Sequence, residues 1–219
     1  MTIFDEKAKE YQDELEKGMI IKGMHHDYFV DYKMYYLSSI LKNAKKVLDY
    51  GCGIGLLSDA IKRKFPNLIV HGFDISSESI EYANKIKKEE IFFTDSLEAL
   101  DDDYDVVLLV TVLHHVPIEE RQNVIKNINK CLKTNGQLIV IEHNVINPLT
   151  RKSIDLCPLD KDAIMLKKKE TKKLLNNFNN VKGKYITFWP QKLCFMRCVD
   201  RFIGWIPLGA QYMCIGIKR

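Results

Sequence analysis

Short apolar runs alternate with segments in which apolar side chains recur every three or four residues, from about residue 44 to residue 144. The runs predict strands over 47–50, 68–73, 91–93, 106–110 and 138–141. The segments between them predict helices over 56–64, 77–87 and 119–132. Every position from 106 to 110 is apolar, so this strand is expected to be covered on both faces. The alternation indicates an α/β fold with a doubly wound, mostly parallel sheet.

The chain on either side of this central part has a looser pattern. A polar segment over 5–17 and an aromatic-rich stripe over 27–42 each predict a helix, which gives a helical N-terminal cap over 1–43. Residues 145–166 contain two prolines and are expected to be irregular or to form short helices. A helix over 168–178 and strands over 185–188 and 212–217 complete the prediction.

Composition narrows the class of protein. The 219 residues are 46% hydrophobic and 28% charged, as in an ordinary globular domain. The net charge of +4 is small and scattered, so no nucleic-acid partner is expected. No apolar run is long enough to span a bilayer, the first residues do not resemble a signal peptide, and the six cysteines form no CxxC pair. We therefore expect reduced thiols and a cytoplasmic location. The sequence does not indicate the oligomeric state.

The strongest chemical signal is the glycine loop, Asp49-Tyr50-Gly51-Cys52-Gly53-Ile54-Gly55, which joins the first predicted strand to a helix. Glycines let a ligand lie against the main chain, and ligands of open parallel sheets bind at the carboxyl ends of the strands. The spacing differs from the G-x-G-x-x-G fingerprint, and Asp49 would repel a pyrophosphate but attract a cation. A nicotinamide dehydrogenase is therefore the least favoured enzyme, and a tight turn without a ligand is the alternative.

Two further acids end the next two predicted strands. Asp74 follows the second strand, where a carboxylate can accept hydrogen bonds from ribose hydroxyls. Asp95 follows the third strand, where it could accept from an adenine amino group, with Ser96 beside it. The alternative for both acids is a helix cap.

Together, these segments resemble the motifs of class I S-adenosylmethionine (SAM)-dependent methyltransferases. The resemblance lies in 47–55, 72–76, 104–116 and 132–138, which follow one another in the family's order. It implies a Rossmann-like, seven-stranded sheet whose last strand is antiparallel. Residues 1–219 would form one methyltransferase domain, with a cofactor-binding core over 44–144 and a substrate-side part over 145–219.

The resemblance also implies which residues hold SAM. The glycine loop would contact the methionine part and Asp49 its amino group, while Asp74 would bind the ribose. Ile75 would flank the adenine, and Thr111 and His114 would line the sulfonium side. The residues expected to bind SAM are Tyr11, Asp49, Gly51, Cys52, Gly53, Gly55, Asp74, Ile75, Asp95, Ser96, Thr111 and His114.

Methyl transfer from a sulfonium is an in-line displacement, so the protein mainly has to align the donor methyl group with the acceptor. No metal is expected to take part. The product of the cofactor is S-adenosylhomocysteine (SAH). A hydroxyl or ammonium acceptor must lose a proton, for which histidine is suited near neutral pH. His114 and His115 follow the fourth predicted strand and His143 follows the fifth. His143 is the first choice for the base, because His114 is assigned to the cofactor. The alternative for each is a hydrogen-bonded structural histidine.

The acceptor is inferred from the outer segments. Residues 141–151, 157–160 and 207–212 resemble a bacterial subgroup associated with glycan and natural-product pathways. We expect O-methylation of a small-molecule or glycan-type acceptor; the alternatives are an N-methyltransferase or a non-catalytic, cofactor-binding regulatory module. Arg151 could hold an anionic acceptor group, although a solvated arginine is favoured. The aromatic segment 188–209 is interpreted as a substrate lid, a peripheral lipid contact or a helix packed between the last two strands, of which the packed helix is favoured.

Overall fold

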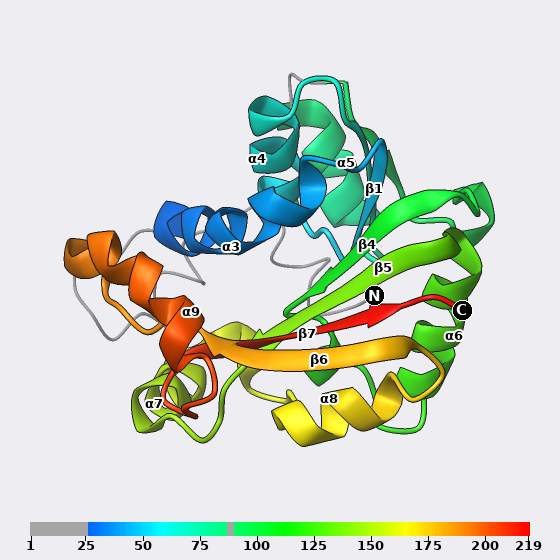
Figure 1. Cartoon of the computed structure of the whole chain (residues 1–219). Coiled ribbons are helices and arrows are strands. Elements are labelled where there is room, and N and C mark those ends of the chain that lie inside the picture. Colours follow the sequence, from blue (N-terminus) through cyan, green and yellow to red (C-terminus); the bar gives the residue numbers. More distant parts are fainter. Residues whose placement is uncertain (1–25, 87–89) are drawn as a thin grey trace.

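Seven strands form one sheet in the order β3-β2-β1-β4-β5-β7-β6 (Figure 1). The strands are β1 (Lys46–Tyr50), β2 (Ile69–Phe73), β3 (Phe92–Thr94), β4 (Tyr104–Val110), β5 (Leu132–His143), β6 (Asn179–Ile186) and β7 (Gln211–Ile217). The first five run parallel, whereas β7 is antiparallel to both β5 and β6. The predicted Rossmann-like sheet with an antiparallel last strand is therefore confirmed.

This computed structural model describes residues 26–86 and 90–219. Its helices are α3 (His26–Leu41), α4 (Leu56–Lys64), α5 (Ser77–Ile86), α6 (Arg121–Cys131), α7 (Pro148–Leu156), α8 (Lys168–Leu174) and α9 (Asp200–Ile203). Short 3-10 helices are η1 (Leu97–Ala99), η2 (Leu113–His115), η3 (Pro158–Asp160) and η4 (Gln191–Val199). The predicted helix over 5–17, with Tyr11, lies outside the described residues.

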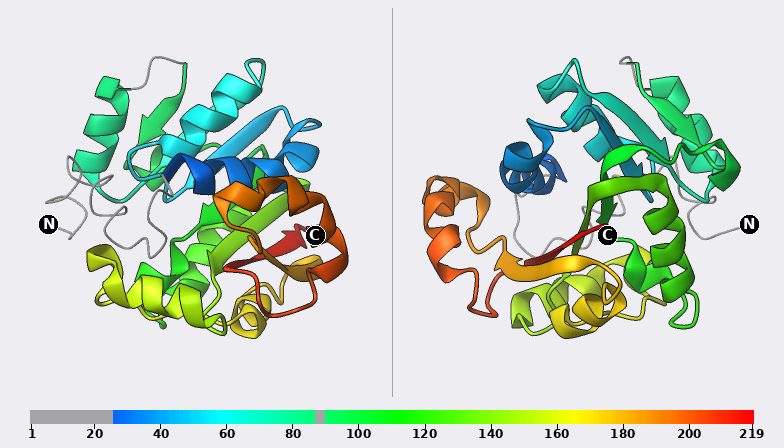
Figure 2. Two further views of the ribbon diagram at one scale, coloured as in Figure 1. Left: turned by 90° about the vertical axis from the view of Figure 1, so that its left-hand side faces the viewer. Right: turned by 45° about the vertical axis from the view of Figure 1, so that its right-hand side comes forward.

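Helices cover both faces of the sheet (Figure 2). Val106, Leu108 and Val110 pack in the cluster that includes α3 and α4. Val107 and Leu109, which point to the other face, pack with α6. The continuous apolar run of β4 is thus explained by burial on both sides. In the described part of the chain, no helix is long and apolar enough to cross a membrane.

Two strands begin earlier than the hydrophobic pattern predicts. β5 starts at Leu132, which pairs with Tyr104 before a bulge, although the residues from Lys133 to Gly136 are typical of a turn. β6 starts at Asn179 rather than at 185, because it is the edge strand of the sheet and its first positions are polar and largely exposed. Polar edge positions carry no hydrophobic signal, so the pattern detects the buried end of such a strand.

The favoured packed interpretation of segment 188–209 is wrong for several of its aromatic side chains. Along the chain, the segment does form helices between β6 and β7, namely η4 and α9, while the two strands pair directly with one another. Its large aromatic side chains are not packed, because Phe195, Phe202 and Trp205 are exposed.

A buried carboxylate connects this segment to the N-terminal helix. Asp200, at the start of α9, accepts hydrogen bonds from the hydroxyls of Tyr32 (2.7 Å) and Tyr36 on α3, and from the indole nitrogen of Trp189 (2.6 Å). Residues some 160 positions apart in sequence are thereby held together by one side chain.

Replacing Asp200 by alanine is expected to lower the free energy of unfolding by about 2–3 kcal/mol. The two tyrosine hydroxyls and the indole N–H would lose the carboxylate that accepts their hydrogen bonds. This loss outweighs the gain from no longer burying a carboxylate, which is costly to desolvate. Urea denaturation followed by circular dichroism measures the change. Asp31→Ala, which removes an exposed carboxylate from the same α3, is the matched control and should change stability by less than about 0.5 kcal/mol. Equal effects of the two substitutions would contradict the role given to Asp200.

Candidate active site

The glycine loop folds in a conformation that its glycines make accessible. Gly51, Gly53 and Gly55 have φ of 80°, 52° and 76°, in the left-handed region. A Cβ atom on Gly51 would lie 2.3 Å from Val112 Cγ2, in the segment after β4. The backbone amides of Gly51 and Cys52 both donate to the carbonyl of Phe73 at the end of β2. The loop is therefore fixed against the ends of two neighbouring strands, and it leaves no room for a side chain at Gly51.

Asp74 is joined directly to this loop. Its carboxylate accepts hydrogen bonds from the backbone amide of Gly53 (2.7 Å) and from that of Ser76 (3.0 Å). The cap of α5 is provided by Ser76, whose hydroxyl accepts from the amide of Ser79. Ile75, beside Asp74, has 75% of its surface exposed. An aliphatic side chain left open next to a fixed carboxylate suits a ligand that carries both an apolar ring and hydroxyl groups.

The third strand brings Asp95 and Ser96 to the same edge of the sheet. Asp95 is exposed and accepts a hydrogen bond from Ser77 Oγ at the start of α5. Ser96 Oγ donates to Glu98 instead. The structure thus gathers the loop, Asp74 and Asp95 at the carboxyl ends of β1, β2 and β3, which is where ligands of such sheets bind.

Asp49, at the end of β1, is buried beneath the loop. Its carboxylate accepts a hydrogen bond from Ser58 Oγ (2.7 Å) on α4. Burial raises the pKa of Asp49 to about 6, although Ser58 and the nearby ammonium of Lys33 oppose the shift. A cationic ligand bound beside this carboxylate would favour its ionised form.

Sequence reasoning missed Lys33. It lies on α3 within the aromatic-rich stripe over 27–42, yet its ammonium interacts with Asp49 and Glu142. Burial lowers the pKa of Lys33 to about 8, and the two carboxylates oppose that shift. The signal that could have indicated a charge facing inward is a single lysine among the apolar and aromatic residues of this helix.

The loop after β4 begins at a strained residue. Thr111 has a φ of 56°, which is uncommon for a β-branched side chain. Its amide donates to the carbonyl of Ile141 on β5, and its hydroxyl donates to the carbonyl of Val110. Strained residues that the surrounding structure holds in place cluster at functional sites, so Thr111 remains a candidate cofactor contact.

His114 is buried between two carboxylates. Its Nδ1 lies 2.6 Å from Glu142 Oε2, and its Nε2 lies 3.3 Å from Asp160 Oδ1. Burial alone would lower the pKa of His114, but the two carboxylates outweigh it and raise the pKa to about 9. His114 is therefore a cation at neutral pH, with both nitrogens protonated and little surface left for a ligand.

The other two candidate histidines have the opposite character. Burial and the adjacent His114 cation lower the pKa of both His115 and His143 to about 4. The His143 ring lies 5.3 Å from the ring of His114, and His115 Nε2 faces Asp160 Oδ1 at 3.5 Å. Both are partly exposed. Near pH 7, each is therefore a neutral imidazole, and the lowered pKa also makes it a weaker base than a solvated histidine.

One group among the described residues has the composition of a metal site. His114, His115 and Asp160 offer ligand atoms that all lie within 4.8 Å of one another. In this structure, Asp160 contacts the ring nitrogens of both His114 and His115, and Glu142 contacts the other ring nitrogen of His114.

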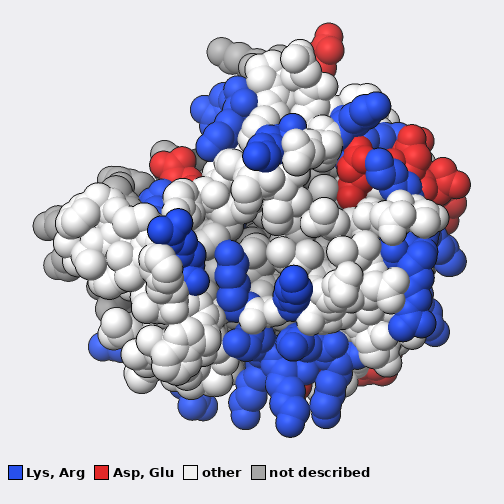
Figure 3. All heavy atoms as spheres, viewed as in Figure 1, with Lys and Arg blue, Asp and Glu red and all other residues white. Residues whose placement is uncertain are grey.

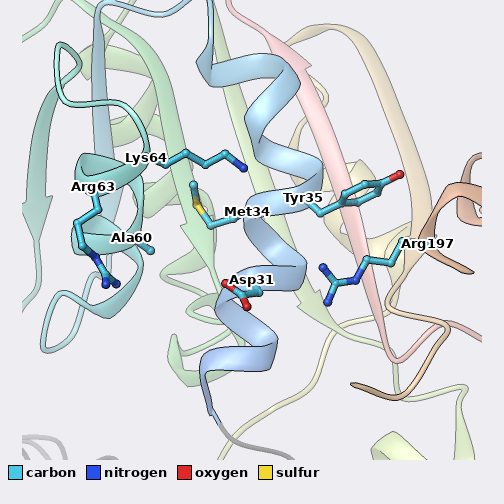
Figure 4. A pocket seen from close by; sticks show the side chains of 7 residues that line it. All are labelled: Asp31, Met34, Tyr35, Ala60, Arg63, Lys64 and Arg197. Carbon is cyan, nitrogen blue, oxygen red and sulfur yellow. The ribbon is translucent and has the colours of Figure 1, made fainter. Parts of the chain in front are cut away.

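A groove of about 530 Å³ lies away from these residues, between α3, α4 and η4 (Figure 4). It is lined by Asp31, Met34, Tyr35, Ala60, Arg63, Lys64 and Arg197. Lys33, the α3 residue that interacts with Asp49 and Glu142, is not among the lining residues. The groove therefore does not overlap with the predicted cofactor residues.

Comparison with known proteins agrees with this geometry. The family described as a methyltransferase domain matches residues 24–180. A demethylmenaquinone methyltransferase of Thermotoga maritima is 28% identical over 146 residues, which are 65% of this chain and 60% of that protein. A ubiquinone biosynthesis O-methyltransferase of Coxiella burnetii is 33% identical over 111 residues, which are 48% of this chain and 46% of that protein. The chain thus spans about half the length of these relatives.

Among solved structures, a magnesium protoporphyrin IX methyltransferase from Synechocystis PCC 6803 with bound SAH has the same fold. The TM-score is 0.62 at 19% identity, over 99% of this chain and 98% of that chain. Because the family match covers most of the described chain, the protein belongs to the methyltransferase domain family. The predicted class, a class I SAM-dependent methyltransferase, and the predicted cofactor are confirmed.

The affinity for SAM is expected to fall about tenfold between pH 7 and pH 5. Protonation of Asp49 below its pKa of about 6 would remove the negative charge that the sequence-based prediction places beside the cationic cofactor. Binding would therefore require loss of a proton at low pH, whereas above pH 7 Asp49 is already ionised. Isothermal titration at several pH values measures the dependence. Asp49→Asn is the control, since it should bind SAM weakly with little pH dependence; an unchanged slope in this variant would assign the effect to another group.

Proposed function

We propose that the chain transfers the methyl group of SAM to an oxygen atom of a small-molecule or glycan-type acceptor, with His143 as the base. The observation that carries the proposal is the neutral, partly exposed imidazole of His143 at the carboxyl end of β5. β4 alone separates β5 from β1, whose end carries the glycine loop. The axes of β1 and β5 are therefore about 10 Å apart, which suits a donor and an acceptor bound side by side.

SAM supplies a methyl group that already carries its leaving group, so the protein has to bind, align and exclude water. We assign the ribose hydroxyls to Asp74, the adenine face to Ile75 and the methionine part to the glycine loop, above Asp49. The acceptor hydroxyl would lie next to His143. As the carbon–sulfur bond breaks and the new carbon–oxygen bond forms, His143 would take the hydroxyl proton.

We propose a positioning role for His114. Glu142 uses one carboxylate oxygen to accept from the amides of Val112 (3.0 Å) and Leu113 (2.8 Å) and the other to bind His114. This arrangement connects the end of β5 to the segment after β4. A histidine that is already a cation cannot accept the acceptor's proton, which favours His143 for that step.

The acceptor class is inferred from two sources. The names of the two curated relatives, demethylmenaquinone and ubiquinone biosynthesis, favour a small molecule. The resemblance of residues 141–151, 157–160 and 207–212 to a glycan-pathway subgroup favours a glycan-type acceptor. Arg151 is exposed on α7 and available to an anionic group of either kind.

Incubation with methyl-deuterated SAM and a pool of hydroxylated small molecules and oligosaccharides tests the proposal. We expect release of SAH and a product with the label on oxygen, identified by mass spectrometry. A label on nitrogen would replace O-methylation with N-methylation. SAM binding without SAH release from any acceptor pool would indicate a regulatory module.

A further inference from the structure

Large apolar side chains are exposed along the segment that joins β6 to β7. The exposed fractions are 72% for Phe195, 64% for Phe202, 76% for Trp205 and 60% for Leu208. Isolated exposed leucines are ordinary, but two phenylalanines, a tryptophan and a leucine within fourteen positions are a concentrated apolar surface.

The start of α7 extends this surface. The side-chain amide of Asn147 donates to the carbonyl of Leu208, and the hydroxyl of Thr150 donates to the carbonyl of Ala210. These contacts place Ile146 and Leu149, which are both exposed, beside the 205–208 turn. We call these six exposed residues the apolar rim; they are Ile146, Leu149, Phe195, Phe202, Trp205 and Leu208. The rim lies at the carboxyl end of β5, because α7 follows that strand.

Positive charge lies beside the rim. Arg201 is exposed in the same segment, whereas Arg197 is partly buried with its guanidinium over the ring of Tyr32 on α3. The acid of this segment, Asp200, is buried and hydrogen bonded. The helix that precedes the neighbouring β6, α8, carries four lysines and one glutamate. Figure 3 shows the lysine and arginine side chains gathered over α8 and β6, and the largest group of acidic side chains at the opposite end of this face.

We propose that the apolar rim is a docking surface for an anionic lipid bilayer. Exposed tryptophan, phenylalanine and leucine side chains flanked by arginine and lysine fit a headgroup boundary, where the rings enter the acyl region and the cations meet lipid phosphates. A second copy of the chain fits less well, because two rims that are both flanked by positive charge would repel one another when brought face to face. This proposal does not depend on the nature of the methyl acceptor.

Vesicle sedimentation tests the proposal on the full chain. We expect binding to vesicles of phosphatidylcholine mixed with phosphatidylglycerol, weaker binding to phosphatidylcholine alone, and release by high salt. The affinity for these vesicles should be at least about tenfold lower for the variant with both Phe202→Ser and Trp205→Ser, because two rings no longer enter the bilayer. Arg201→Glu should also weaken binding about tenfold, because it exchanges attraction for repulsion at the lipid surface.

Two control variants distinguish binding through the apolar rim from non-specific binding to vesicles. Phe92→Ser removes an exposed ring at β3, the far edge of the sheet, and Lys42→Glu reverses a charge near the amino end of β1. Both should bind vesicles like the wild type, and all variants should retain SAM binding and their melting temperature. Brominated lipids should quench the fluorescence of wild-type protein, but not that of Trp205→Phe, since the other tryptophan, Trp189, is partly buried and bonded to Asp200.

Two results would overturn the proposal. One is that wild-type protein fails to bind the anionic vesicles at low salt, or that the rim variants bind as well as the controls. The other is that the wild type is a dimer which the Phe202→Ser, Trp205→Ser variant converts to a monomer, without vesicle binding by either form; a second copy would then cover the rim.

Discussion

Replacing His143 with alanine is expected to lower kcat about 10²–10⁴-fold while SAM affinity stays within about threefold. The substitution removes the neutral imidazole proposed to take the acceptor's proton, and it leaves the glycine loop and Asp74 in place. At saturating SAM, kcat of the wild type should be constant from about pH 7 to pH 5 and fall as pH drops through about 4, because protonation of His143 removes the base. SAH release under steady-state conditions measures both effects, once an acceptor is known.

His115→Ala is the matched control. His115 is also partly exposed, and its pKa is also lowered to about 4. We expect its replacement to reduce kcat less than about tenfold, because it does not lie at the end of β5. A large loss with His115→Ala and a small loss with His143→Ala would reverse the assignment. Circular dichroism at each pH establishes that the enzyme is folded where its rate is compared.

Replacing Asp74 with alanine is expected to weaken SAM binding about 10²–10⁴-fold. Two charge-assisted hydrogen bonds to the ribose would be lost, each contributing about 1.5–3 kcal/mol. The backbone amides of Gly53 and Ser76 would also lose the acceptor that fixes the loop. Isothermal titration measures the affinity, and a thermal melt in the absence of SAM separates loss of the contact from loss of the fold.

Asp95→Ala is the comparison for Asp74. Asp95 is exposed at the neighbouring strand end and is assigned to one adenine contact, so its replacement should cost about tenfold in affinity or less. If Asp74→Ala left the dissociation constant within about threefold of the wild type, the cofactor would not bind across this carboxylate.

The buried elements of the fold could be predicted from the pattern of apolar residues, and the others could not. β4 and α4 lie close to their predicted bounds because each buries a regular set of side chains. The start of α7 could have been predicted, because Asn147 caps the helix and Pro148 occupies its first turn. The two prolines of this region are equally compatible with irregular structure. The polar half of β6 gave no signal at all.

For the candidate site, local motifs were informative and long-range contacts were not. The glycine loop and Asp74 could be located because glycine spacing and strand-end acids have local meaning. Lys33 and Asp160 reach the site from α3 and η3, far away in sequence, and only packing brings them there. The charge of His114 likewise depends on Asp160 and Glu142, so no reading of the His114-His115 pair could have distinguished the cation from the neutral imidazole.

The placement of β7 has a consequence for how the molecule is assembled during translation. β6 pairs with β7 and with no other strand of the described sheet, and β7 itself lies between β6 and β5. While the ribosome is still adding residues 211–217, β5 is an open edge and the segment 179–186 has no strand to join. The five parallel strands can pair as they emerge, whereas β6 must wait until β7 is inserted between two strands made earlier.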